Sequence, residues 1–167
     1  LAEESKALVH ALITKHEIDC EPGAGQLVCA AKPAHLDALK RRAEKLAVDY
    51  DYPHQQCVSK AGLADMLGSS AYCGASLDTR AAYLHPLNYA LGLARACSAA
   101  GVRIFERSAV SGYGGSGPVT LKTAGGEVQA RFMVLACNAH LDELEPRLAA
   151  TIMPINNFLV ATAPLGD

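Results

Sequence analysis

The sequence predicts a mixed α/β fold, in which helices and strands alternate along one chain. Three observations predict it: apolar residues recur at helical spacing in several segments, two short alternating segments flank a glycine turn, and residues 132–137 are continuously apolar. A continuous apolar run is typical of a strand that is buried on both faces in a parallel sheet. With 167 residues, 50% of them hydrophobic, the chain can form one packed core or portions of two domains.

The first half is expected to contain helices separated by strands. An amphipathic helix is predicted over residues 1–18, because its apolar residues form one stripe. Pro33 opens a second helix, and a short third helix is closed by Gly68. Strands are predicted over residues 26–31 and over "QQCVS", and a mostly extended stretch over "AYCGASLDTRAAYLHP".

The second half is more regular. Pro86 suits the first position of a helix that runs to a terminating Gly101, and His85 is expected to cap its N-terminus. A strand is predicted over "VRIFERSAV", residues 102–110. A β-hairpin flap follows, with "PVTLKT" and "VQARF" as its strands and "AGGE" as a four-residue turn. The last predicted strand is the apolar run at residues 132–137.

The composition limits the partners and the compartment. Fifteen Lys and Arg against 17 Asp and Glu give a net charge of −2, so no nucleic-acid or membrane partner is expected. No apolar run approaches the ~20 residues that span a bilayer. The cysteines form no C-x-x-C pair and several have apolar neighbours, which favours reduced, buried thiols and a cytoplasmic location. They are Cys20, Cys29, Cys57, Cys73, Cys97 and Cys137.

Glycines in "SGYGGSGPVTL" have the spacing of a dinucleotide-binding loop. Gly112, Gly114 and Gly117 spell G-x-G-x-x-G. Such a loop holds a pyrophosphate because a helix begins at the loop and directs its free N–H groups at the phosphates. Here Pro118 and a predicted strand follow, so we interpret the segment as a loop whose glycines permit positive φ angles.

Two other sequence features suggest a functional site, but each also has a purely structural explanation. "HEIDC", from His16 to Cys20, resembles the H-E-x-x-H zinc motif, but its second ligand is a cysteine and Pro22 ends the helix nearby, so no metal site is expected. Tyrosines could line a substrate pocket, or they could pack near strand ends. These tyrosines are Tyr50, Tyr52, Tyr72 and Tyr83.

Several segments together resemble a known family. They are "CEPGAGQLVCAAKPAHL", "SSAYCGASLD", "LHPLNYALGLARACSAAGVRIFERSAV", "VTLKTAGGEVQARFMVLACNAHL" and "PRLAATIMPINNFLVATAPL". In these segments the chain resembles the FAD-dependent oxidoreductases of the D-amino-acid oxidase class, which include sarcosine and glycine oxidases. Within the class it is most similar to the branch that oxidises γ-glutamylputrescine. The chain starts at Leu1, and the resemblance implies that it is an internal fragment.

The resemblance implies portions of two domains. Residues 1–18 correspond to a helix of a parallel-sheet FAD-binding domain, and residues 84–146 to a further portion of that domain with its β-hairpin flap. Residues 19–83 correspond to part of a mixed-sheet substrate domain, to which the chain returns over residues 147–167.

The resemblance also implies FAD as the cofactor and four residues that contact it. Val110 matches a valine whose backbone meets the adenine ring, and Ala136, Cys137 and Asn138 match a strand end that lies close to the ADP part. Small residues at the carboxyl end of a parallel strand let the backbone approach a nucleotide. No residue matches a catalytic position. The family's phosphate loop and flavin-ring segment correspond to positions outside residues 1–167.

The implied activity is oxidation of the C–N bond of a small amine or amino acid, with hydride transfer to FAD and release of hydrogen peroxide. Ala82 and Tyr83 stand where glycine and histidine are expected, and Ala163 stands where an acid is expected, so the substrate stays open. The alternative is a non-catalytic α/β binding or assembly module that keeps the scaffold without the cofactor. A fragment is also expected to self-associate through exposed apolar faces.

Overall fold

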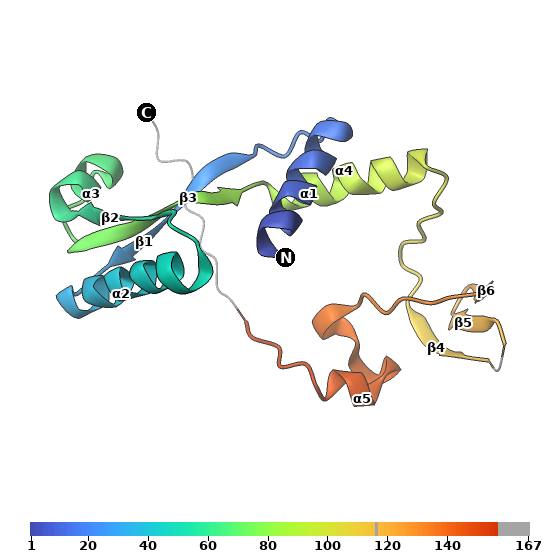
Figure 1. Ribbon diagram of the computed structural model, residues 1–167. Helices are drawn as coiled ribbons and strands as arrows, with labels where there is room; N and C mark the ends of the chain where they lie inside the picture. The colour runs from blue at the N-terminus through green and yellow to red at the C-terminus, as the bar shows by residue number, and fades with distance from the viewer. Residues whose placement is uncertain (116, 157–167) are drawn as a thin grey trace. The chain divides into compact units, whose positions relative to one another are not determined.

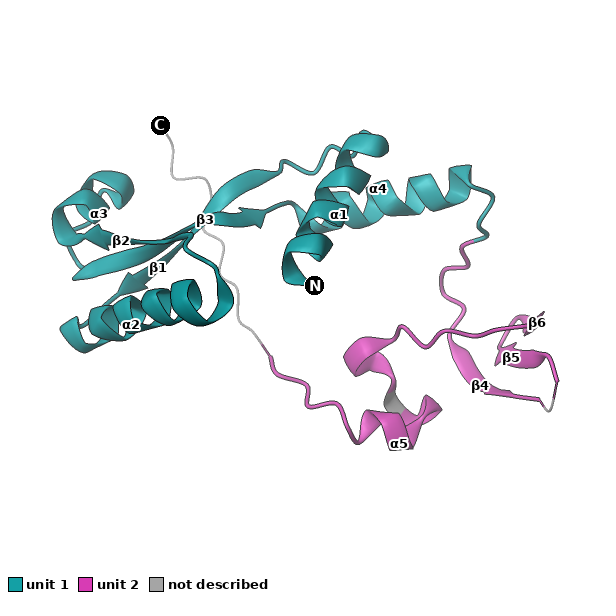
Figure 2. Ribbon diagram, in the orientation of Figure 1, with its two compact units in different colours: residues 1–103 teal, residues 104–167 magenta. Residues whose placement is uncertain are grey.

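The computed structural model describes residues 1–115 and 117–156, and the chain divides into two compact units, residues 1–103 and 104–167 (Figures 1 and 2). The helices of the first unit are α1 (Ala2–Lys15), α2 (Pro33–Tyr50), α3 (Lys60–Leu67) and α4 (Pro86–Ala99), and its strands are β1 (Gly23–Ala30), β2 (Gln55–Ser59) and β3 (Gly74–Tyr83). The second unit contains β4 (Val110–Gly114), β5 (Val119–Thr123), β6 (Gly126–Ala130), the 3₁₀ turns η1 (Asn138–His140) and η2 (Asp142–Leu144), and α5 (Pro146–Ala149).

The sheet of the first unit has β3 at its centre, with β1 and β2 paired antiparallel on either side (Figure 1). Helices α2 and α3 pack against this sheet. Leu63 of α3 is fully buried, together with Ala30 of β1 and Ala75 of β3. The core of the unit therefore lies where the sheet meets its two helices, and apolar burial there is the main stabilising contribution.

A bulge interrupts the pairing of β1 with β3. Ala24 pairs with Ala82 and Gln26 with Asp78, so one residue of β1 faces three residues of β3, Thr79 to Ala81. The single residue is Gly25, whose φ of 91° is a left-handed conformation that glycine adopts without strain. The bulge bends β3 and directs Arg80 away from the regular ladder.

Local signals in the sequence correctly predicted several of the helix termini, and the structure adds a cap at Ser59. The Ser59 hydroxyl accepts a hydrogen bond from the Gly62 N–H at the start of α3, and Gly68 ends that helix with a left-handed φ of 64°. At α4 the predicted cap is confirmed, because His85 Nδ1 accepts a hydrogen bond of 3.3 Å from the Asn88 N–H. Each contact satisfies a group that a helix terminus leaves unpaired.

Helix α1 ends earlier than predicted. It stops at Lys15 instead of continuing to Ile18, because Glu17 adopts a left-handed φ of 49° and the chain turns. The turn places the Ile18 side chain in the core, where it is 4% exposed and packs against Gly92 of α4. The buried side chain of Ile18, which follows the turn, thus joins the end of α1 to α4.

The second unit contains an antiparallel meander in the order β4, β5, β6. The predicted hairpin is confirmed, but its turn has two residues, Ala124 and Gly125, because Gly126 already pairs with Thr123. The Tyr113 hydroxyl of β4 donates a hydrogen bond of 2.6 Å to Glu145 Oε2, which raises the pKa of Tyr113. This bond ties the meander to the start of α5.

Two predicted strands are wrong. Residues 102–109 and 132–137 belong to no strand, and only Val110 of the first segment enters β4. Phe132 is 83% exposed and Val134 is 86% exposed, so the apolar run is not buried on both faces. A strand forms only when a neighbour accepts its hydrogen bonds, and every strand pairing between described residues is antiparallel and made elsewhere. The predicted mixed α/β class is nevertheless confirmed.

The cysteines are less buried than predicted. All six are free, but only Cys20 is buried, whereas Cys57 and Cys97 are exposed. Apolar neighbours in the sequence did not ensure burial, because a neighbour on a strand or helix can face the opposite side. Of the helices in the described ranges, none has the length and apolarity that a bilayer crossing requires. Ala163 and residues 157–167 of the predicted return segment lie outside the described residues.

The contact between Gly92 and Ile18 predicts that adding a side chain at Gly92 destabilises the fold. A methyl group on Gly92 would collide with the Ile18 side chain, so Gly92→Ala should lower the free energy of unfolding by about 1–3 kcal/mol. An unhindered helical glycine gains about 0.5–1 kcal/mol from the same change. Gly62→Ala in α3, where a methyl group meets only ordinary contacts, is the control and should stabilise. Urea unfolding measures both, and stabilisation by Gly92→Ala would contradict the packing described here.

Candidate functional site

Two of the four residues predicted to contact the cofactor line one cavity in the second unit. Val110, at the start of β4, and Cys137, before η1, both face a space of about 710 Å³. Ala136 and Asn138 adjoin Cys137 in the sequence but do not line this space. The full lining is Ala109, Val110, Ser111, Leu121, Met133, Val134, Leu135, Cys137, His140, Leu141, Glu143 and Leu144. We call this space the β4–η1 cavity.

The shape of the β4–η1 cavity depends on a sharp turn at Asn138. This residue has a left-handed φ of 50°, which asparagine tolerates better than most residues. The chain turns here into η1, and the His140 N–H donates a hydrogen bond of 3.0 Å to the Cys137 carbonyl. His140 is thereby held beside Cys137 on the cavity wall.

The β4–η1 cavity fits part of a dinucleotide. Its volume lies within the roughly 300–1,000 Å³ of small-molecule sites, and aliphatic side chains dominate its wall, as a planar base requires. The small side chain of Cys137 leaves room for a ligand to approach the backbone. The lining includes no lysine or arginine, so it offers no cationic partner for phosphates. The lining therefore matches an uncharged, largely apolar group such as a nucleobase and not a phosphate.

The G-x-G-x-x-G segment lies beside this cavity and has the predicted context. Gly112 and Gly114 belong to β4, and strand β5 follows the loop in place of a helix. A methyl group on Gly115, which has a φ of 135°, would collide with the Pro118 carbonyl oxygen. The predicted loop role is wrong for Gly112 and Gly114, which lie within β4 and have no positive φ; Gly115, between the motif positions, is the glycine whose positive φ the connection to β5 uses.

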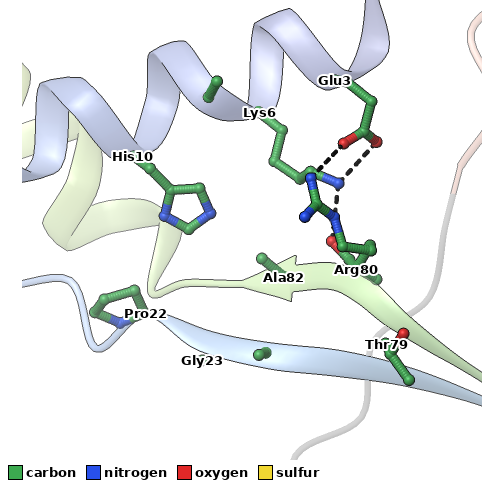
Figure 3. A pocket seen from close by; sticks show the side chains of 11 residues that line it. Glu3, Lys6, His10, Pro22, Gly23, Thr79, Arg80 and Ala82 are labelled. Carbon is green, nitrogen blue, oxygen red and sulfur yellow. Dashed lines mark hydrogen bonds and ion pairs between the residues drawn. The ribbon is translucent and has the colours of Figure 1, made fainter. Parts of the chain in front are cut away.

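The first unit contains a second, differently built space. It has a volume of about 510 Å³ and lies between α1 and the paired ends of β1 and β3 (Figure 3). Its lining is Glu3, Lys6, Ala7, His10, Pro22, Gly23, Ala24, Thr79, Arg80, Ala81 and Ala82. We call it the α1–β3 pocket.

A three-residue charge cluster closes one end of the α1–β3 pocket (Figure 3). Lys6 Nζ donates to Glu3 Oε1 at 2.8 Å and to the Arg80 carbonyl oxygen at 2.9 Å. Arg80 Nη2 donates to Glu3 Oε2 at 3.1 Å. The hydrogen bond from Lys6, and then that from Arg80, lowers the pKa of the Glu3 carboxyl. The cluster joins α1 to the bulge of β3.

Asp78 supports the bulge from within the sheet. Its Oδ1 accepts hydrogen bonds from the backbone N–H groups of Arg80 and Ala81, both at 2.9 Å. The Tyr52 hydroxyl donates to the same oxygen at 2.9 Å, and Gln55 Nε2 donates to Oδ2 at 2.8 Å. One carboxylate therefore fixes the backbone that carries Arg80.

The Asp78 network shifts two pKa values. Burial acts to raise the pKa of Asp78, but the hydrogen bonds from the Arg80 N–H and the Tyr52 hydroxyl outweigh it and hold this pKa below its usual value. Burial, followed by the hydrogen bond to Asp78, raises the pKa of Tyr52 to about 12. Buried Ser76 completes the network by donating to Gln55 Oε1 at 2.7 Å.

The other predicted site residues are not gathered into one place. Tyr52 binds Asp78, and Tyr83 lines only a small space of about 160 Å³ beside the α1–β3 pocket. Within residues 1–115 and 117–156, no three His, Cys, Asp or Glu side chains are grouped as metal ligands would be. The sequence prediction missed Arg80 and its partners, because the only local signal is the one-turn spacing of Glu3 and Lys6 on α1.

Comparison with known proteins identifies the family. A family model described as FAD-dependent oxidoreductase matches residues 1–167. The chain belongs to this family. The resemblance predicted from the sequence is thus confirmed, and with it FAD as the cofactor on which the family depends.

Individual relatives agree with this family. Probable oxidoreductase OrdL of Haemophilus influenzae is 34% identical over 169 residues, which cover 98% of this chain and 39% of that protein. Gamma-glutamylputrescine oxidoreductase of Escherichia coli is 31% identical over 165 residues, covering 98% of this chain and 38% of that protein. The chain therefore spans about two fifths of the length of these relatives.

Solved structures show the same fold. Glycine oxidase from Geobacillus kaustophilus matches with a TM-score of 0.74 at 24% identity, over 86% of this chain and 40% of that chain. L-proline dehydrogenase from P. horikoshii matches with a TM-score of 0.69 at 16% identity, over 90% of this chain and 41% of that chain. At these identities the likeness establishes the fold.

The lowered pKa of Asp78 predicts a pH dependence. A carboxyl whose pKa is lower in the folded state stabilises the fold above its unfolded pKa, about 3.9, and this contribution is lost as the pH falls through the folded value. Asp78→Asn should therefore reduce the fall in unfolding free energy below about pH 4, and it should cost about 1–2 kcal/mol at pH 7. Urea unfolding at several pH values measures both effects.

The control for this experiment is Asp65→Asn on the exposed surface of α3. It removes the same charge and should change the unfolding free energy at pH 7 by less than about 0.5 kcal/mol. Equal costs for the two substitutions would show that the hydrogen bonds of Asp78 do not support the bulge.

Proposed function

We propose that the chain is a portion of a flavin-dependent oxidoreductase that oxidises the C–N bond of a small amine or amino acid. The observation that carries the proposal is the family match over residues 1–167. The β4–η1 cavity supports it, since Val110 and Cys137 meet there. We assign residues 1–18 and 84–146 to the FAD-binding domain, and residues 19–83 and 147–167 to the substrate domain.

The chain's own residues hold the nucleotide end of the cofactor in this proposal. When FAD is bound, the backbone of Val110 would contact the adenine ring, and Ala136, Cys137 and Asn138 would hold the ADP part. Aliphatic side chains such as Leu121 and Leu135 exclude water from the β4–η1 cavity. FAD, when bound, supplies the electron acceptor for the oxidation. No residue of this chain is assigned to catalysis, so its role is to bind and orient the cofactor.

The substrate class follows from the relatives. The names of the matched proteins include a γ-glutamylputrescine oxidoreductase, a glycine oxidase and a proline dehydrogenase, all of which act on an amine or an amino acid. We propose γ-glutamylputrescine as the first substrate to test, and oxygen as the acceptor that releases hydrogen peroxide. The six free thiols favour the cytoplasm as its location. Exposed apolar residues such as Phe132 and Val134 favour self-association.

Protection of a thiol tests the cofactor site directly. Cys137 lines the β4–η1 cavity, so bound FAD should shield it from alkylation. At an FAD concentration of ten times Kd, the labelling rate of Cys137 should fall roughly tenfold, because only the free protein reacts. Exposed Cys57 on β2 is the control and should react at an unchanged rate. Labelling of both thiols is followed by mass spectrometry.

Two substitutions also test whether FAD binds in the β4–η1 cavity. Cys137→Leu should weaken FAD retention after desalting, because the larger side chain fills part of the β4–η1 cavity that Cys137 lines. Val110→Ala should leave retention unchanged, because Val110 acts through its backbone. Equal labelling of Cys137 with and without FAD, together with normal retention by Cys137→Leu, would show that FAD does not bind in this cavity.

Activity is tested on the full-length protein that contains residues 1–167, supplied with FAD. Anaerobic addition of γ-glutamylputrescine should bleach the flavin absorption, and addition of air should restore it with release of hydrogen peroxide. Other amines and amino acids in the same assay rank the substrates. If no compound in the panel bleaches the flavin, the chain is better described as a non-catalytic module.

A further inference from the structure

The α1–β3 pocket is polar at one end and lined by small side chains along its floor. The charge cluster of Glu3, Lys6 and Arg80 closes one end, and His10 extends from α1 toward Pro22 at the other (Figure 3). Between them, the floor consists of Gly23, Ala24, Ala81 and Ala82. No long side chain occupies this floor, so the space of about 510 Å³ is open to a small molecule.

The cations at this end keep donors for a ligand. A lysine ammonium has three N–H groups and an arginine guanidinium has five. Among the described residues, hydrogen bonds take up two of the Lys6 donors and one of the Arg80 donors. The Arg80 side chain is 56% exposed and the Lys6 side chain 25% exposed. An acceptor that enters the pocket can therefore reach donors on both side chains.

The charge of the cluster favours a singly charged anion. Lys6 and Arg80 carry two positive charges and Glu3 carries one negative charge, which leaves one positive charge to be balanced. A monocarboxylate balances it, whereas a phosphate dianion leaves the cluster negative. The fork of N–H groups on Arg80 also matches the two oxygens of a carboxylate.

We propose that the α1–β3 pocket binds a small monocarboxylate with a short aliphatic chain. The carboxylate accepts hydrogen bonds from Arg80 and Lys6, and the aliphatic chain lies on Ala81 and Ala82. This site is separate from the proposed oxidoreductase function, because it involves neither FAD nor any residue of the β4–η1 cavity. Either proposal can fail while the other stands.

The experiment titrates butyrate into the protein without FAD and follows binding by ligand-observed NMR. Saturable binding is expected. Arg80→Gln should weaken it at least about tenfold, because a charge-assisted pair of hydrogen bonds is lost. Ala82→Leu should weaken it by filling the floor while every charge stays in place. Arg42→Gln on the exposed surface of α2 removes the same charge outside the pocket and should leave binding unchanged. Thermal unfolding of each variant shows that it is folded.

Several outcomes would overturn the proposal. Absence of saturable butyrate binding removes the site altogether. Affinity that survives both Arg80→Gln and Ala82→Leu places binding elsewhere. Butylamine that binds as well as butyrate, or inorganic phosphate that binds more tightly, shows that the ligand class is wrong. Butyrate binding that is selective and sensitive to both variants establishes the pocket.

Discussion

The hydrogen bonds of Asp78 are the constraint on which the first unit depends. A bulge leaves backbone N–H groups without partners in the ladder. The Asp78 carboxylate accepts the N–H groups of Arg80 and Ala81 and so takes the place of the missing strand. Tyr52 and Gln55 hold the carboxylate from the other side. The position of Arg80, its contact with α1 and the pocket beside them all follow from this arrangement.

Sequence patterns predicted the parts of the fold that local chemistry determines. Pro33 and Pro86 begin helices because their fixed φ suits the first turn, and Gly68 ends α3 because it can adopt a left-handed φ. Contacts between distant segments were not predictable. Arg80 binds Glu3, which lies 77 residues earlier in the sequence. The residues next to Arg80 and Glu3 in the sequence give no sign of this contact.

The apolar run at residues 132–137 shows most clearly what could not be predicted from the sequence. Its composition is that of a buried strand, but strand formation depends on two segments rather than one. In the described residues no neighbouring strand pairs with it, so Phe132 and Val134 are exposed, while Met133, Leu135 and Cys137 are half-buried at the β4–η1 cavity. The meeting of Val110 and Cys137 was expected from family resemblance alone, because hydrophobic periodicity carries no information about which loops share a cavity.

The bulge in β3 determines which deletions preserve the facing of the side chains in this sheet. From Asp78 to Ala82 the strand advances four positions while β1 advances two, from Gln26 back to Ala24. Both steps are even, so side chains on either side of the bulge point to the same faces as in an unbroken ladder. Two residues can therefore be lost here without inverting the strand, whereas the loss of one would turn every later side chain to the other face. A two-residue deletion that includes Arg80 would therefore keep the alternation of the strand, but it would remove Arg80 from the pocket and a backbone N–H group that Asp78 binds.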